Sequence, residues 1–260
     1  MSRSSLYYVS KQEPKDWKLK EKIEMVLREH PAYGSRRLSE RLGMSRERIQ
    51  RAMRKFGIKP YRRRGKEWHK KKSISIIYPN LLHGTVPAHR HHIWAADFTE
   101  LGFKGKIVYV ATTIDLHTRE VVGVAVSLRK GAVLVTQALW AALLHHPRPE
   151  IFHSDNGTEY AARSFINLLS RCSIKISRSH PGCPWENGYQ ESFYGKFKID
   201  FGDPNRFSSL GELVAEIYAT IWAYNHTRIH SALKMPPVAY IKKMALDPSS
   251  HSRIKLRLSV

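Results

Sequence analysis

The N-terminal part of the chain repeats apolar residues at the spacing of an α-helix. Residues 18–29 carry them three and four positions apart, which predicts a first helix. A second helix is expected from Ser35 to the break at Gly43, and Ser45 is placed to cap a third one. Three short helices with a Gly-containing turn before a basic third helix match a helix-turn-helix over residues 18–58. A basic helical hairpin that only packs on a neighbour is the alternative.

From about residue 92 the pattern changes to short runs rich in Val, Ile and Tyr, separated by turn residues. The expected strands are 93–98, 107–114, 120–126, 150–153 and 174–177, and the expected helices are 132–145, 160–170, 184–200 and 209–226. Three antiparallel strands followed by alternating helices and strands predict an α/β domain over residues 92–245, with a mixed sheet covered by helices. Gly and Pro in the loop at residues 179–183 indicate a mobile flap.

Three further segments lie outside these two predicted domains: an N-terminal junction at residues 1–17, a basic linker at 59–91 and a basic tail at 246–260. Lys and Arg are so dense in residues 59–72 that this stretch is not expected to join a core. We interpret it as an arm that lies along DNA phosphates; a solvated tether is the alternative.

The charge of the chain points to a polyanionic partner. Its 44 Lys and Arg face only 22 Asp and Glu, which gives a formal net charge of +22. No apolar run reaches the roughly 18 residues that a membrane-spanning helix needs, and the N-terminus lacks the apolar core of a signal peptide. The two cysteines indicate no disulfide framework and fit a reducing cytosol. The histidines around His89, His91 and His92 have no Cys-x2-Cys pair, which disfavours structural zinc.

Three carboxylates stand in surroundings that are unusual for such a basic chain. Asp97 lies in an apolar strand, Asp155 follows another strand and precedes a turn, and Glu191 lies on a predicted helix. A buried carboxylate needs a partner, and a divalent cation is one candidate. The alternatives are a buried Arg beside Asp97 and a plain Asx turn at Asp155. Glu186 is too far around the helix to share a site with Glu191, and the helix dipole explains it.

The residues expected to contact DNA are mostly basic. They are Arg46, Arg48, Arg51, Arg54 and Lys55 in the third helix, Arg62, Arg63 and Arg64 in the linker, and Asn187 and Lys198 on the helix of Glu191.

These residues also carry a family resemblance. The motifs Trp94-x-x-Asp97-x-Thr99, His153-Ser154-Asp155-x-Gly157-x-x-Tyr160 and Asn187-Gly188-x-x-Glu191-Ser192-Phe193 resemble the DDE catalytic core of retroviral-integrase-type transposases. The similarity is to the second reading frame of bacterial insertion sequences of the IS-three type. It extends to His30-Pro31-x-Tyr33-Gly34 and to Tyr224-Asn225-x-x-Arg228-x-His230-Ser231-Ala232-Leu233. Asn156, Glu159 and His117 depart from the family's pattern.

The resemblance implies an RNase H-like fold, with Asp97 on the first strand, Asp155 after the fourth and Glu191 on a following helix. It implies a transposase that uses these three acids as catalytic residues and as ligands of two Mg²⁺ ions, with Mn²⁺ as a possible substitute. The implied partners are the terminal inverted repeats of an element, target DNA, further copies of the chain and an upstream-frame protein. The implied location is the nucleoid in the bacterial cytoplasm.

Two other functions fit part of the pattern. A non-catalytic DNA-binding regulator would use residues 18–58 alone and would yield no metal-dependent products. A plain nuclease on the same fold would hydrolyse DNA without joining it.

Overall fold

The computed structural model describes residues 12–61, 78–180 and 182–246. The chain forms two compact units, residues 1–63 and 64–260, which are described separately. The predicted DNA contacts Arg62, Arg63 and Arg64 lie outside the described residues. No helix in the described ranges is both long and apolar enough to cross a membrane.

The first unit contains three helices, α2 (Gln12–Glu29), α3 (Ser35–Leu42) and α4 (Arg46–Lys55). Their apolar faces share a buried core that includes Ile23, Leu38 and Ile49. Gly43 adopts a left-handed conformation (φ 62°) that ends α3, and the hydroxyl of Ser45 accepts a hydrogen bond from the amide of Arg48, as predicted for a capping residue.

The first helix begins at Gln12 rather than near residue 18, so it includes part of the predicted junction segment. The reason is a long-range ion pair. The carboxylate of Asp16 is 2.9 Å from Arg51 and 3.1 Å from Lys55, and the ring of Trp17 lies 5.1 Å from that of Phe56. These contacts attach the first turns of α2 to α4, and local apolar spacing cannot reveal them.

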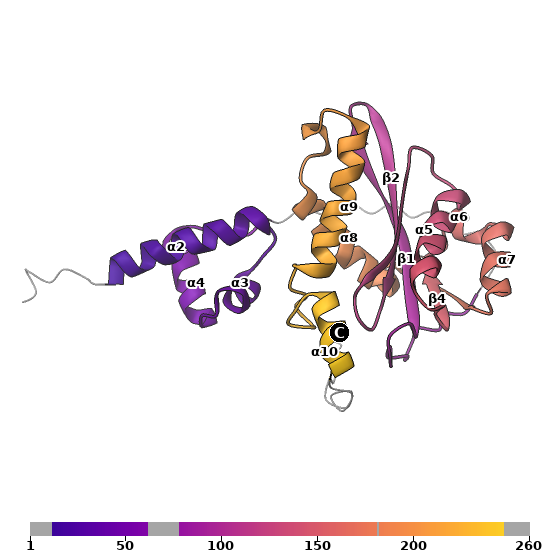
Figure 1. Ribbon diagram of the computed structural model, residues 1–260, viewed down its shortest axis with the longest axis horizontal. Helices are drawn as coiled ribbons and strands as arrows, with labels where there is room; N and C mark the ends of the chain where they lie inside the picture. Colours follow the sequence, from indigo (N-terminus) through magenta and orange to yellow (C-terminus); the bar gives the residue numbers. More distant parts are fainter. Residues whose placement is uncertain (1–11, 62–77, 181, 247–260) are drawn as a thin grey trace, which may run out of the picture. The chain divides into compact units, whose positions relative to one another are not determined.

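The second unit is built on the predicted mixed five-stranded sheet (Figure 1). Its strands are β1 (Ile93–Phe103), β2 (Lys106–Asp115), β3 (Val121–Ser127), β4 (Ile151–Ser154) and β5 (Lys175–Arg178), in the order β3-β2-β1-β4-β5. The first three strands are antiparallel, whereas β4 pairs parallel to β1 and β5 parallel to β4. The fold class expected from the sequence is therefore confirmed.

The helices of this unit are α5 (Ala132–His145), α6 (Thr158–Ala161), α7 (Arg163–Arg171), α8 (Gly188–Phe201), α9 (Leu210–His226) and α10 (Pro237–Leu246), with short 3-10 helices η1 (Pro184–Asn187) and η2 (Pro204–Arg206). Two predicted helices are each divided in two. Ala162 separates α6 from α7, and Pro184 starts η1 rather than α8. The helix α10 was not predicted.

Alternating residues along the strands fill two cores on opposite faces of the sheet. From β1, Trp94 and Ala96 join a cluster with α5 and α7, whereas Leu101 and Phe103 join a cluster with α8 and α9. Figure 1 shows α5 and α7 on one side of the sheet and α8 and α9 on the other.

The helix α5 lies directly on β3 at Gly123. A Cβ atom at this position would be 2.2 Å from the carbonyl oxygen of Ala138 and 2.8 Å from Cβ of Ala142. The close approach of helix and strand therefore requires the absence of a side chain here.

We predict that Gly123→Ala lowers the free energy of unfolding by about 1–3 kcal/mol, because the added methyl group overpacks the interface. Urea denaturation measures the change. Gly102→Ala is the matched control, since it lies in β1 with no atom within 4 Å of an added Cβ. Equal stability of Gly123→Ala and the unsubstituted chain would contradict this account of the packing.

Candidate active site

Asp97 and Asp155 each follow the last paired residues of two neighbouring parallel strands by two positions. The β1–β4 ladder pairs Ile93 with Ile151 and Ala95 with His153, Asp97 lies further along β1, and Asp155 directly follows β4. Neighbouring strands are about 4.8 Å apart where they pair. The ladder ends just before the two aspartates, so both carboxylates emerge together where the strands stop pairing.

The surroundings of both aspartates are half-buried. One oxygen of Asp97 accepts a hydrogen bond from the amide of Phe98 at 2.8 Å, and Oδ1 of Asp155 accepts one from the amide of Gly157 at 2.9 Å. The second contact is the Asx turn considered from the sequence. It involves Oδ1 of Asp155.

Tyr160 connects the two aspartates electrostatically. Its ring is buried, and its hydroxyl finds no hydrogen-bond partner among the described residues. Burial raises the pKa of the Tyr160 phenol well above its usual value, and the negative charges of Asp97 and Asp155 raise that pKa further. The charges of both carboxylates therefore affect the same phenol group, which indicates that both aspartates lie near Tyr160.

The third acid, Glu191, lies on the first turn of α8, whose inner face is attached to β1. Asn187 Nδ2 donates to the carbonyl of Ala96 at 3.3 Å, and Gln190 Nε2 donates to that of Ala95 at 2.7 Å. One turn later, the hydroxyl of Tyr194 donates to the carbonyl of Asp97 at 2.8 Å. The Glu191 side chain itself is exposed. The turn that carries Glu191 is thus held against the strand segment that carries Asp97.

Glu186 has a separate role in the loop before α8. It accepts hydrogen bonds from the backbone amide and the ring Nδ1 of His180. Burial alone would raise the pKa of Glu186, but the hydrogen bonds from His180 outweigh burial and lower it. Glu186 therefore binds His180, and this contact gives it a role separate from that of Glu191.

His153 lies beneath the flap, and its burial lowers its pKa to about 4. Its ring is 2.9 Å from the hydroxyl of Ser177 and 3.1 Å from that of Ser179. The neutral ring therefore ties β4 to the end of β5 and to the start of the flap.

The donor chemistry of the three acids suits a hard divalent cation, because carboxylate oxygens are the ligands that Mg²⁺ prefers. Within the described ranges, however, no three His, Cys, Asp or Glu side chains form a ready-made metal cluster. The carboxylates of Asp97, Asp155 and Glu191 therefore remain predicted ligands, supported by their chemistry and by their attachment to β1 and β4.

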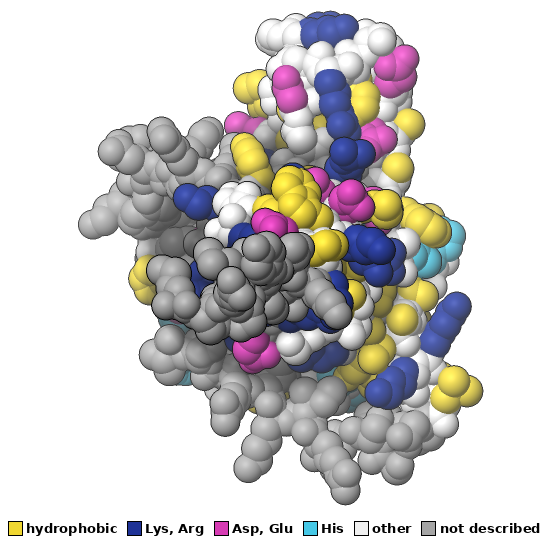
Figure 2. Space-filling view, turned by 90° about the vertical axis from the view of Figure 1, so that its left-hand side faces the viewer, with side chains coloured by type: hydrophobic (Ala, Val, Ile, Leu, Met, Phe, Trp, Pro, Cys, Tyr) yellow, Lys and Arg dark blue, Asp and Glu magenta, His cyan; other side chains and the backbone are white. Residues whose placement is uncertain are grey.

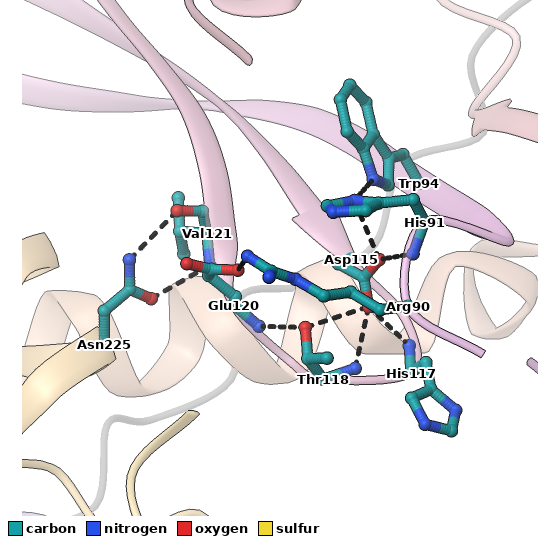
Figure 3. A network of polar contacts seen from close by, with 9 residues as sticks. All are labelled: Arg90, His91, Trp94, Asp115, His117, Thr118, Glu120, Val121 and Asn225. Atoms are coloured by element: carbon teal, nitrogen blue, oxygen red, sulfur yellow. Dashed lines mark hydrogen bonds and ion pairs between the residues drawn. The ribbon is translucent and has the colours of Figure 1, made fainter. Parts of the chain in front are cut away.

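Asp115, by contrast, is fully explained as a structural residue (Figure 3). Its buried carboxylate accepts hydrogen bonds from the amides of His91, His117 and Thr118, at 2.6, 3.0 and 2.7 Å, and from the Thr118 hydroxyl. These contacts close the β2–β3 hairpin onto the segment that enters β1. Asp115 is thus accounted for by the hairpin that it stabilises.

The predicted DNA contacts of α4 are all exposed, but three of them also have partners within this unit. Arg51 and Lys55 form the ion pairs with Asp16, and Arg54 donates to the carbonyl of Gln50. Arg48 and Arg54 line a groove with Lys15. Figure 2 shows Lys and Arg side chains set among acidic and hydrophobic ones on the face in view.

The two predicted contacts on and next to α8 differ in exposure. Asn187 is buried and bound to β1, and Lys198 is half-buried two turns beyond Glu191, about 10 Å along the helix. Their contact with DNA stays a prediction.

Sequence reasoning gave no role to Gln190, Tyr194 or Tyr160, although these residues hold or adjoin the site. Gln190 and Tyr194 are four positions apart and so share one helix face, which was the available signal. The target of that face, the carbonyl groups of β1, has no signature in a sequence.

Comparison with known proteins identifies the class of this fold and site. The integrase core domain family matches residues 87–184 and again residues 172–237. The chain is 31% identical over 238 residues to a transposase for insertion sequence element IS904 of Lactococcus lactis, covering 86% of this chain and 93% of the relative. It is 30% identical over 261 residues to an IS600 31 kDa protein of Shigella sonnei, covering 94% and 96%.

Among solved structures, a chain of a simian T-cell lymphotropic virus intasome shares the fold. It has a TM-score of 0.50 at 18% identity and covers 86% of this chain and 72% of that one. The chain therefore belongs to the transposases of bacterial insertion sequences that carry an integrase-type DDE core. It is an enzyme of DNA cleavage and strand transfer, that is, a polynucleotidyl transferase.

The hairpin network of Figure 3 predicts a loss of stability in acid. Burial lowers the pKa of His91 to about 4, despite the opposing charge of Asp115, and its Nδ1 accepts a hydrogen bond from the Trp94 indole at 3.2 Å. In the unfolded chain His91 takes up a proton near pH 6.5, whereas in the folded chain it does so only near pH 4. The free energy of unfolding therefore falls as the pH drops from 6.5 towards 4.

Urea denaturation at pH 7 and pH 5 measures this effect. His91→Gln should lose less stability between these pH values than the unsubstituted chain, because the variant has no proton to take up at this position. Identical losses in both proteins would contradict the assignment.

Proposed function

We propose that Asp97, Asp155 and Glu191 are the catalytic triad of this transposase. The proposal is supported by the parallel pairing of β1 with β4, which ends at Ala95 and His153, two residues before Asp97 and Asp155, and by the attachment of the Glu191 turn to the same stretch of β1.

In this proposal Asp97 is the shared ligand, with Asp155 for one Mg²⁺ and with Glu191 for a second, and Mn²⁺ is a possible substitute. Two such ions, when bound, supply Lewis-acid stabilisation of the attacking and leaving oxygens of a phosphodiester. The chain contributes fixed carboxylates. Asp155 is held by its turn to Gly157, and the backbone of Asp97 is held by Tyr194.

The site would act twice. Water first attacks a phosphodiester at the end of the element and frees a 3′-hydroxyl, and that hydroxyl then attacks a phosphodiester of the target, releasing one strand end as the new bond forms. Neither step needs a covalent link to the protein.

The first unit is proposed to bind the terminal inverted repeats, with the exposed Arg and Lys side chains of α4 in contact with DNA. Further copies of the chain would assemble on the two ends, in the nucleoid. A partnership with an upstream-frame protein is an implication of the family resemblance and stays a prediction.

The triad is tested by Asp97→Asn, which keeps the shape of the side chain and removes its charge. We expect loss of detectable cleavage and strand joining, while DNA affinity is retained, because ion binding needs the carboxylate. Asp203→Asn is the matched control; this aspartate accepts from the amide of Asn205 in η2, away from the site, and the variant should keep full activity. Joining by Asp97→Asn at the parental rate would refute the assignment.

The role of α4 is tested by charge removal at positions with different partners. Arg48→Gln should weaken DNA binding and reduce the slope of log affinity against log salt by about 1, the loss of one phosphate contact. Asp16→Asn should instead lower the unfolding temperature, because it removes the partner of Arg51 and Lys55. Unchanged affinity and slope in Arg48→Gln would remove this residue from the DNA interface.

A further inference from the structure

Lys130 is a positively charged side chain that lies close to residues neighbouring the proposed catalytic aspartates. It lies in the loop between β3 and α5, and its ammonium is 3.3 Å from Oε1 of Glu159 and 5.0 Å from the centre of the Phe98 ring. The Lys130 side chain is 40% exposed, whereas that of Glu159 is only 5% exposed. The position of the ammonium is therefore fixed from the protein side while the solvent side stays open.

Both anchors of Lys130 adjoin a proposed catalytic aspartate. Phe98 follows Asp97 directly along β1. Oδ1 of Asp155 and Oε2 of Glu159 each lie 2.9 Å from the point where a Cβ of Gly157 would stand, so these two oxygens are at most twice that distance apart. Lys130 is thus attached to the immediate neighbours of both aspartates.

The negative charge of the proposed site gives a positively charged side chain such as Lys130 a role in binding DNA. Asp97, Asp155, Glu159 and Glu191 are four carboxylates around the place where a phosphodiester must come, and they repel it. An ammonium has three N–H donors, so a contact with Glu159 on one side leaves donors for a phosphate on the other.

We infer that Lys130 binds a backbone phosphate of the DNA strand next to the reacting phosphodiester, with Glu159 and Phe98 as its supports. This inference rests on the proposed triad for the location of the reacting phosphodiester. A purely structural ion pair is the competing interpretation, in which Lys130 only neutralises the buried Glu159.

The experiment removes the charge and measures DNA binding by the full chain in metal-free buffer, so that no turnover is involved. The probe is a fluorescent duplex taken from the end of the element, and affinity is measured over a series of salt concentrations. Lys130→Gln should raise Kd about two- to fivefold, the range of one exposed ion pair, and reduce the salt slope by about 1.

Two control variants separate the interpretations. Lys106→Gln removes the same charge at the far end of the β1–β2 hairpin, about 20 Å along the strand from Asp97, and should change Kd less than Lys130→Gln. Glu159→Gln removes a carboxylate that repels DNA but leaves the Lys130 ammonium, so it should bind the duplex at least as tightly as the unsubstituted chain and keep its salt slope.

A set of duplexes with single neutral methylphosphonates identifies the phosphate. When the methylphosphonate replaces the phosphate that Lys130 contacts, beside the cleaved bond, Lys130→Gln and the unsubstituted chain should bind with the same Kd, because the charge that distinguishes them has no partner. If Lys130→Gln lowers only the unfolding temperature and leaves Kd and the salt slope unchanged, the inference is overturned. An incorrect triad assignment would be detected in a different experiment, as strand joining by Asp97→Asn. It would not change the DNA affinities measured for the Lys130 variants.

Discussion

Hydrogen bonds from α8 and from its N-cap residue Asn187 to the carbonyl groups of β1 hold the two parts of the candidate site together. Gln190 and Asn187 bind the carbonyls of Ala95 and Ala96, and Tyr194 binds that of Asp97, close to where the β1–β4 ladder ends. A buried carbonyl left without a donor costs about 1–3 kcal/mol. Strand and helix are therefore coupled, and Glu191 cannot leave the neighbourhood of Asp97 without breaking these bonds.

The hydrogen-bond and ion-pair partners described for the acidic side chains differ between the site and the rest of the chain. Most carboxylates outside the site have a clear partner: Asp16 has two bases of α4, Asp115 has a set of amides, and Glu186 has His180. At the site, Asp97 and Asp155 use one oxygen each on neighbouring amides, and Lys130 pairs with Glu159 rather than with either aspartate.

Much of the second unit could be predicted from the sequence because its elements have strong local patterns. The helix at 132–145 and four of the strands match the observed bounds to within one residue, since each has an apolar run and a turn at its end. The first strand begins at Ile93 as predicted but continues to Phe103 rather than ending at 98, because it pairs with β2 along its whole length. The start of α2 was missed because it depends on Asp16 meeting α4, thirty-five residues further along the chain. The division of the helix near Pro184 was missed because the 3-10 turn of η1 is fixed by contacts of Glu186 and Asn187 with other segments.

For the site, the sequence identified which acids to consider but not how they are held. The pairing of β1 with β4 just before Asp97 and Asp155, and the amide and hydroxyl groups that attach α8, are long-range contacts. Lys130 had no sequence signal at all, because its partners are Phe98 and Glu159, each about thirty residues away.

The most direct measurement is the anomalous scattering of Mn²⁺ in crystals of the full chain bound to DNA from the end of the element. The account predicts anomalous peaks in contact with the carboxylates of Asp97 and Asp155, and with Glu191 at the same centre. Well-ordered crystals with bound DNA whose peaks lie elsewhere, or that show no peak beside Asp97, would contradict it.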